Sequence, residues 1–149
     1  MNHILIVDGQ GGRIGRALAE RLSALLDPAD PAFDLTVVGS NAMATANMLK
    51  GSASAKGATG ENAVIVCARR ADVIVGPIGI IIADAMLGEI TPAMATAVSS
   101  SPARRVLIPM NKSRCENYVV GVKDAGLAAL LDEAAETAAR FAGSEGDLL

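Results

Sequence analysis

The stretch Ile4–Leu18 constrains the fold of this chain most strongly, because its hydrophobic period changes partway along. Ile4–Val7 is a run of large apolar residues, and the turn Gly9–Gly12 follows Asp8. From Ile14 onward, apolar residues recur every three or four positions, as they do on one face of a helix. A short strand, a glycine-rich turn and an amphipathic helix form the first half of a dinucleotide-binding βαβ unit.

The glycine spacing favours an anion site at the start of this helix. Gly9, Gly12 and Gly15 match G-x-x-G-x-x-G, and this spacing resembles that of extended and atypical short-chain dehydrogenases. A helix start carries unpaired N–H groups and a partial positive charge, which favour a phosphate. Glycines allow the backbone to approach that phosphate closely. A glycine-rich turn that binds nothing is the alternative.

Length and periodicity predict a three-layer α/β/α Rossmann-like domain with a mostly parallel sheet of about five strands. The domain is expected over residues 1–142, with a frayed tail over 143–149. Strands are expected at 4–7, 35–38, 72–76, 105–109 and 118–122, and helices at 13–26, 41–50, 60–70, 80–87, 91–100 and 125–141. A strand over 63–68 is the alternative to part of the third helix. Strand orders 3-2-1-4-5 and 2-1-3-4-5 both remain open.

Composition excludes several classes of partner. The net charge is −3 and no basic patch is interleaved with aromatic residues, so nucleic acid is not expected. Apolar runs are too short for a membrane span, and no signal peptide is evident, so we expect a cytoplasmic protein. Cys67 and Cys115 lack the spacing of a metal site, and no metal is predicted. An apolar content of 51% favours a homo-oligomer.

The end of the second predicted strand would meet the ribose of a dinucleotide. NAD enzymes usually carry Asp or Glu there, but this chain has Gly39, Ser40 and Asn41. The missing carboxylate weakens NAD as a ligand and leaves NADP, a mononucleotide or another phosphorylated ligand open. No arginine suited to a 2′-phosphate stands there either.

A second small-residue loop spans Lys50–Asn62. Lys56, Thr59 and Glu61 combine a cation, a hydroxyl and an acid near a predicted helix start, which are components of an anion cradle. The loop does not match G-x-x-x-x-G-K-[ST], because the lysine precedes the glycines. A flexible linker with a solvated lysine is the alternative.

The predicted ligand-binding residues follow successive strands and gather where their carboxyl ends would meet. They are Asp8, Gly9, Gln10, Gly11, Gly12, Arg13, Ile14, Gly39, Ser40, Asn41, Lys56, Thr59, Gly60, Glu61, Asn62, Gly76 and Pro77. For Asp8, orientation of the glycine turn is favoured over a contact to ribose or metal. Asp84 is expected as a buried carboxylate in an apolar helix, and Glu89 as a helix-end or subunit contact. His3 should lie at the opposite end of the first strand.

Five motifs taken together resemble the small bacterial and archaeal proteins grouped as domain of unknown function 3842. They are IVDGQGG, VGSNAMATANML, KGATGENA, GPIGIIIADAMLGEIT and LIP, within a stretch from about Ile4 to Val122. The resemblance implies a small Rossmann-like fold. It implies no reaction, and no catalytic residue is carried over from it.

Three hypotheses for function follow. The first is a nucleotide- or dinucleotide-binding protein, with NADP as one candidate. The second is a small enzyme acting on a phosphorylated metabolite, with Lys56, Glu61 and Asp84 as candidate catalytic residues. The third is a non-catalytic oligomeric sensor or scaffold. Hydride transfer of the short-chain dehydrogenase type is rejected, because Tyr118 is followed four positions later by Val122 rather than Lys.

Overall fold

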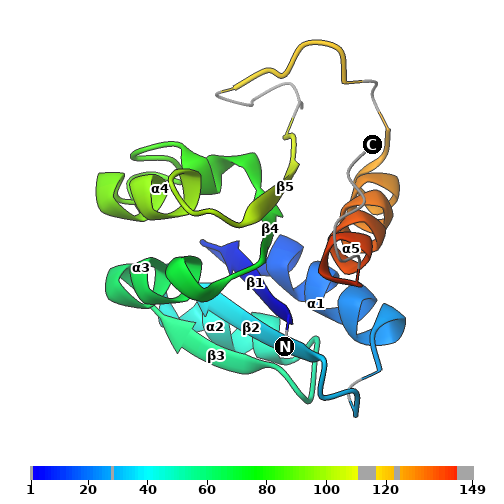
Figure 1. The fold of residues 1–149 in the computed structure, drawn as a ribbon. Helices are drawn as coiled ribbons and strands as arrows, with labels where there is room; N and C mark the ends of the chain where they lie inside the picture. Colours follow the sequence, from blue (N-terminus) through cyan, green and yellow to red (C-terminus); the bar gives the residue numbers. More distant parts are fainter. Residues whose placement is uncertain (1, 28, 111–116, 123–124, 144–149) are drawn as a thin grey trace.

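The computed structural model describes residues 2–27, 29–110, 117–122 and 125–143 (Figure 1). Strands and helices alternate along most of these residues. The elements are β1 (Asn2–Asp8), α1 (Arg13–Leu25), β2 (Phe33–Gly39), α2 (Ala42–Leu49), β3 (Lys56–Thr59), α3 (Glu61–Arg70), β4 (Val73–Pro77), the 3-10 helix η1 (Ile78–Ile81), α4 (Pro92–Ser99), β5 (Arg104–Ile108) and α5 (Leu127–Gly143).

The strands of the described residues form one parallel, five-stranded sheet in the order β3-β2-β1-β4-β5. Among the predicted strands, 35–38, 4–7, 72–76 and 105–109 follow the relative order 2-1-3-4 of the second alternative, and β3 is an additional strand at the edge beside β2. The chain builds outward from β1 to β3, then crosses to the other side of β1 to form β4. Ligands of open α/β sheets bind at the carboxyl ends of the strands where the order reverses in this way. The turn after β1 lies at that point.

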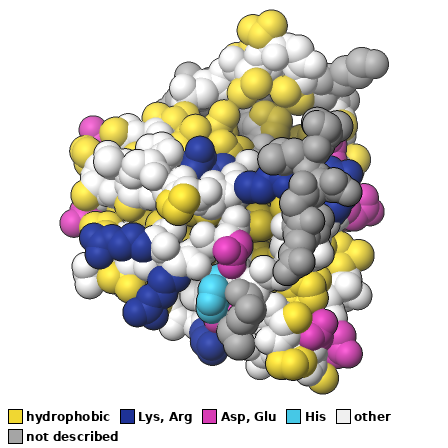
Figure 2. All heavy atoms as spheres, viewed as in Figure 1, with side chains coloured by type: hydrophobic (Ala, Val, Ile, Leu, Met, Phe, Trp, Pro, Cys, Tyr) yellow, Lys and Arg dark blue, Asp and Glu magenta, His cyan; other side chains and the backbone are white. Residues whose placement is uncertain are grey.

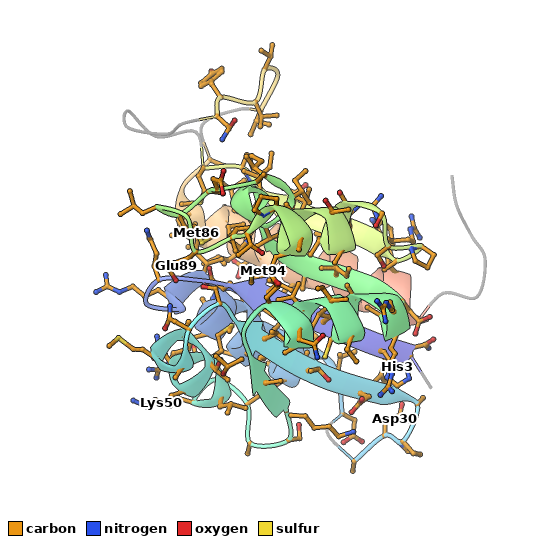
Figure 3. All side chains as sticks on the ribbon, turned by 90° about the vertical axis from the view of Figure 1, so that its left-hand side faces the viewer. His3, Asp30, Lys50, Met86, Glu89 and Met94 are labelled. Atoms are coloured by element: carbon orange, nitrogen blue, oxygen red, sulfur yellow. The ribbon has the colours of Figure 1, made fainter. Side chains whose placement is uncertain are left out.

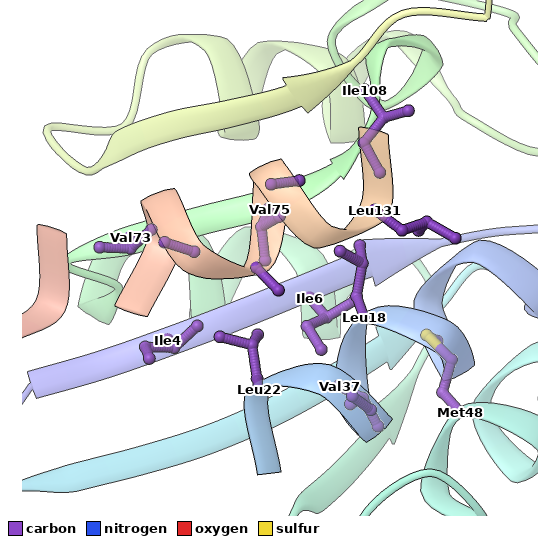
Figure 4. Packing of buried hydrophobic residues seen from close by; sticks show 14 of the residues in the cluster. Ile4, Ile6, Leu18, Leu22, Val37, Met48, Val73, Val75, Ile108 and Leu131 are labelled. Carbon is purple, nitrogen blue, oxygen red and sulfur yellow. The ribbon is translucent and has the colours of Figure 1, made fainter. Parts of the chain in front are cut away.

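Two apolar layers hold the helices against the sheet and confirm the three-layer prediction. Ile4 and Ile6 of β1 face α1, α2 and α5, while Leu5 and Val7 face α3 and α4. Figure 1 shows α1 and α5 side by side on one side of the sheet, with α3 and α4 on the other. Figure 4 shows Leu18, among others, packed onto the first face. Because both faces are covered, β1 reads as a continuous apolar run.

The fifth strand lies at a different place from the predicted one. Lys56–Thr59, expected as part of a loop, forms the edge strand β3 and pairs with β2 from Thr36 to Gly39. Tyr118–Val122, expected as a strand, contains no strand, and its Tyr118 side chain is 69% exposed. The prediction was wrong because β3 is a short edge strand of polar and small residues, so no apolar alternation marks it.

The segment after β4 is not the predicted apolar helix. It begins with the short helix η1 and then turns back, so that the N–H of Asp84 donates to the carbonyl of Ile90 at 2.7 Å. Asp84, Met86 and Leu87 all have positive φ angles, which a right-handed helix excludes. Asp84 is exposed rather than buried. We call residues 82–91 the β4–α4 loop.

The remaining helices agree with the sequence. Asn41 caps α2 by accepting from the N–H of Ala44, and Thr91 caps α4. The helix α3 replaces the alternative strand over 63–68, and α5 includes Gly143, the first residue of the predicted tail. The rest of that tail and Cys115 lie outside the described residues. Within the described part of the chain, we find no helix with the length and apolar character needed to span a membrane.

Candidate functional site

Asp8 holds the glycine turn that joins β1 to α1. Its Oδ1 accepts from the N–H of Gly9 and its Oδ2 from the N–H of Gly15, both at 2.8 Å. The side chain is buried, and this burial raises the pKa of Asp8 above its usual value, although the two N–H groups oppose the rise. This geometry matches the turn-orienting role favoured from the sequence.

Two asparagines hold the carbonyl groups of the same turn. Asn41 Nδ2 donates to the carbonyl of Gln10 at 2.9 Å, and Asn47 Nδ2 donates to the carbonyl of Gly11 at 2.8 Å. Among the described residues, nothing accepts a hydrogen bond from the backbone N–H groups of Gly11 and Arg13. The turn therefore has satisfied carbonyls and open donors, which is the polarity that an anion requires.

The glycine spacing within the turn also has a packing cause: its glycines let α1 approach its neighbours closely. A Cβ on Gly12 would lie 2.6 Å from the carbonyl oxygen of Ala44, and one on Gly15 would lie 2.2 Å from Met48 Sδ. Gly12 also has a φ of 68°. Gly12 is therefore required whether or not a ligand binds, and a side chain at Gly15 would displace Met48. Gly11 differs, because a Cβ there would meet only Arg13 Cγ at 3.9 Å.

Glu89, from the β4–α4 loop, reaches across to the turns after β1 and β2. Its Oε1 accepts from Ser40 Oγ at 2.7 Å, from Asn41 Nδ2 at 2.7 Å and from the backbone N–H of Gln10 at 2.9 Å. The bond from Ser40 is the main reason that the pKa of Glu89 lies below its usual value, so the carboxylate stays ionised. Within the chain Glu89 makes these contacts rather than a helix-end contact, and the subunit contact expected as the alternative stays a prediction.

Sequence reasoning missed this role of Glu89. The one available signal was a charged residue between Gly88 and the buried Ile90, directly before a capped helix. Its partners precede it by tens of residues, and only the sheet topology brings them together.

Several other predicted residues lie at the same sheet edge. Thr59 Oγ1 is 2.7 Å from Thr45 Oγ1, and the N–H of Gly60 donates to the carbonyl of Gly39 at 2.9 Å. Glu61 accepts from the hydroxyl of Thr91. The residues that follow or end neighbouring strands at this edge are Asp8, Gly9, Gln10, Gly11, Gly12, Arg13, Ile14, Gly39, Ser40, Asn41, Thr59, Gly60, Glu61, Asn62, Gly76 and Pro77.

Lys56 does not join this group. It begins β3, and its Nζ lies 2.9 Å from Asp34 Oδ1, while His3 Nδ1 lies 3.2 Å from Asp34 Oδ2. Figure 2 shows histidine, basic and acidic side chains close together on one face, and Figure 3 shows His3 and Glu89 at opposite ends of the strands. The hydrogen bond from Lys56 is the main cause that lowers the pKa of Asp34. His3 lies where the sequence predicted.

Comparison with known proteins identifies a family but no activity. A model for Domain of unknown function (DUF3842) matches residues 3–142. No curated protein and no solved structure matches the chain. The family match spans all the elements of the sheet, the glycine turn and the β4–α4 loop. The chain belongs to the DUF3842 family, whose function is unknown.

Proposed function

We propose that this protein binds a nucleotide or dinucleotide at the carboxyl edge of its sheet, with phosphate over the start of α1. The observation that carries the proposal is the pair of open N–H groups of Gly11 and Arg13, at the point where strand order reverses. The dipole of α1 adds a partial positive charge there. The exposed Arg13 side chain makes no ion pair within the described residues and is available to a phosphate.

The carboxylates near the turn restrict where the phosphate can lie. Asp8 and Glu89 already occupy the N–H groups of Gly9, Gly15 and Gln10. A phosphate over those groups would be repelled by like charge. The side of the turn that carries Gly11 and Arg13 is therefore the phosphate position, and the Ser40 side faces the remainder of the nucleotide.

The alternative of an enzyme acting on a phosphorylated metabolite has less support. Lys56 pairs with Asp34, Glu61 contacts Thr91, and Asp84 is exposed in the β4–α4 loop. No hydrogen bond or ion pair joins these three candidates within the described residues. A sensor without catalysis is compatible with the same nucleotide site, and binding without turnover would favour it.

Thermal unfolding followed by circular dichroism tests the proposal with NAD, NADP, ATP, FMN and inorganic phosphate. A ligand at ~100 times its Kd adds roughly 2.7 kcal/mol to the free energy of unfolding. In a domain of this size that means a rise of several degrees in Tm.

Gly11→Asp is the informative variant, because position 11 has space for a side chain and the new carboxylate would repel phosphate. Gly11→Ala is its matched control. We expect a nucleotide-dependent rise in Tm for the wild type and for Gly11→Ala, and none for Gly11→Asp. Absence of a rise with any nucleotide would remove the proposal.

A further inference from the structure

A carboxylate lies beside the end of β2, although none of the residues that end this strand is acidic. The residues that end β2 are Gly39, Ser40 and Asn41, and none of them is acidic. Glu89 nevertheless binds Ser40 Oγ and Asn41 Nδ2, both at 2.7 Å. The β4–α4 loop thus brings an acidic group to the end of the second strand, the position at which open sheets of this order meet the ribose.

One oxygen of the Glu89 carboxylate, Oε2, is left for a ligand. All protein donors bind Oε1, and no described residue donates to Oε2. Figure 3 shows Glu89 and Met86 at the same end of the sheet. A carboxylate oxygen of this kind accepts hydrogen bonds from hydroxyl groups and offers none to an anion.

Backbone hydrogen bonds and the buried Ile90 position the loop that carries Glu89. The N–H of Ile90 donates to the carbonyl of Ala85 at 3.2 Å, and Ile90 is fully buried. Met86 and Leu87 have φ angles of 57° and 56°, values that persist only where the surrounding structure imposes them. The carboxylate is therefore positioned before any ligand arrives, which reduces the ordering cost of binding.

The negative charge of Glu89 determines whether a ribose with free hydroxyl groups or one with a 2′-phosphate can bind beside it. Within the described residues no Lys or Arg forms an ion pair with Glu89, so a second anion beside it would lack a counter-charge. The buried Asp8 carboxyl lies on the other side of the turn; burial is the main cause that raises the pKa of Asp8, and the charge of Glu89 adds to the rise. A ribose hydroxyl donates to such a carboxylate, whereas a phosphate ester is repelled by it.

We propose that Glu89 selects a nucleotide whose ribose has free hydroxyl groups and rejects one that carries a 2′-phosphate. This inference rests on the proposed nucleotide site and names its ligand class: NAD or an unmodified adenine nucleotide rather than NADP. It reverses the expectation from the end of β2 alone, because the acidic group comes from a different loop. Glu89 is then a specificity residue that touches the ribose.

The test measures affinity by isothermal titration of the full chain with NAD and with NADP. We expect NAD to bind at least about tenfold more tightly than NADP, since like charges at contact distance repel even when partly screened. Glu89→Gln retains an oxygen for Ser40 and Asn41 but removes the charge, so the ratio should fall below about threefold. Glu20→Gln, on the exposed side of α1, is the control and should keep the wild-type ratio.

The ratio separates specificity from a structural role, because a merely structural Glu89 would weaken both ligands equally. Tighter or equal binding of NADP to the wild type, or an unchanged ratio in Glu89→Gln, would overturn the inference and leave nucleotide binding intact. If none of NAD, NADP, ATP and FMN binds, both the proposed function and the inference are overturned; if FMN alone binds, only the inference is overturned.

A second comparison needs no substitution and covers the case in which Glu89→Gln does not fold. ATP and 2′-deoxy-ATP differ only in the 2′-hydroxyl, from which Glu89 would accept a hydrogen bond. Loss of a hydrogen bond to a charged group should weaken the deoxynucleotide by about tenfold or more in the wild type. Equal affinities would contradict the role given to Glu89.

Discussion

At the scale of single residues, the site depends on two carboxylates in different surroundings. Asp8 is buried beneath the glycine turn and binds backbone N–H groups on both of its oxygens. Glu89 lies above the turn, binds through one oxygen and stays ionised. The first therefore serves the shape of the turn, and the second is available to a ligand.

Asp8→Ala should destabilise the protein, because the buried N–H groups of Gly9 and Gly15 lose their acceptors. An unsatisfied buried donor costs about 1–3 kcal/mol, and we expect a loss in that range or above it. Urea unfolding followed by circular dichroism measures it. Asp132→Ala is the control, since Asp132 is exposed and its pair with Arg21 contributes less than about 1 kcal/mol. Equal losses in the two variants would contradict the role of Asp8.

At the scale of elements, the close approach of α1 and α2 depends on Gly12. Ala at this position would place its Cβ against the backbone of Ala44 and would keep a positive φ. We expect Gly12→Ala to lower the free energy of unfolding by about 2 kcal/mol or more, from overpacking and left-handed backbone together. Gly11→Ala, in open space, should change it by less than about 0.5 kcal/mol. Similar chemical denaturation midpoints for both variants would refute this account.

The ion pair between Asp34 and Lys56, at the edge of the sheet, makes a pH-dependent contribution to the free energy of unfolding. Its folded pKa lies below the unfolded value of 3.8, so its stabilisation is present above that value and is lost as pH falls through the folded pKa. Lys56 is 71% exposed, so solvent screening limits the pair to less than about 1 kcal/mol.

We therefore expect Lys56→Met to lower the free energy of unfolding measurably at pH 7 and to have a smaller effect at pH 3. Urea unfolding at the two pH values tests this, with the substitution preserving the aliphatic stem. Lys50→Met, on an exposed residue with no ion pair in the described part of the chain, is the control. An effect of Lys56→Met that does not change with pH would show that Asp34 is not its partner in solution.

The sequence predicted the helices and strands whose spacing of apolar residues indicates which side is buried, or whose first residue is a recognisable helix cap. β1 and α1 show a clear change of period, and α2 and α4 have Asn41 and Thr91 as caps. It could not predict β3, where an exposed edge strand needs no apolar alternation. Most of the site followed from strand ends, but Glu89 did not, because its position depends on a loop with positive φ angles that propensities do not encode.

At the scale of the whole molecule, the last helix completes the core. α5 packs its small residues onto the face of the sheet that α1 also covers, and Arg21 Nε contacts Asp132 Oδ1 at 2.7 Å between the two helices. The Arg104 guanidinium also lies over the ring of Phe141. The side chains that would be uncovered without α5 include Ile4, Val73, Val75 and Ile108.

A chain ending at Gly126 should therefore lack a cooperative unfolding transition. Fully exposing an aliphatic side chain costs roughly 1.5–3 kcal/mol, so the loss of several is comparable with a typical net stability of about 5–15 kcal/mol. Circular dichroism during heating measures the transition, and full-length Glu136→Gln, at an exposed position of α5, should unfold as the wild type does. A cooperative transition in the shortened chain would show that the remaining elements form a core by themselves.

The position of Tyr118 determines what the intrinsic fluorescence of the protein can report. The chain has no Trp and a single Tyr, and that ring is 69% exposed in the segment after β5. Its intrinsic fluorescence therefore reports on that segment and not on the apolar layers beside the sheet. A non-fluorescent nucleotide such as ATP or NAD brings no emission of its own, so following its binding at the glycine turn by fluorescence would need a fluorophore introduced there. Phe141→Trp, beneath Arg104, would give the packing of α5 an optical signal of its own.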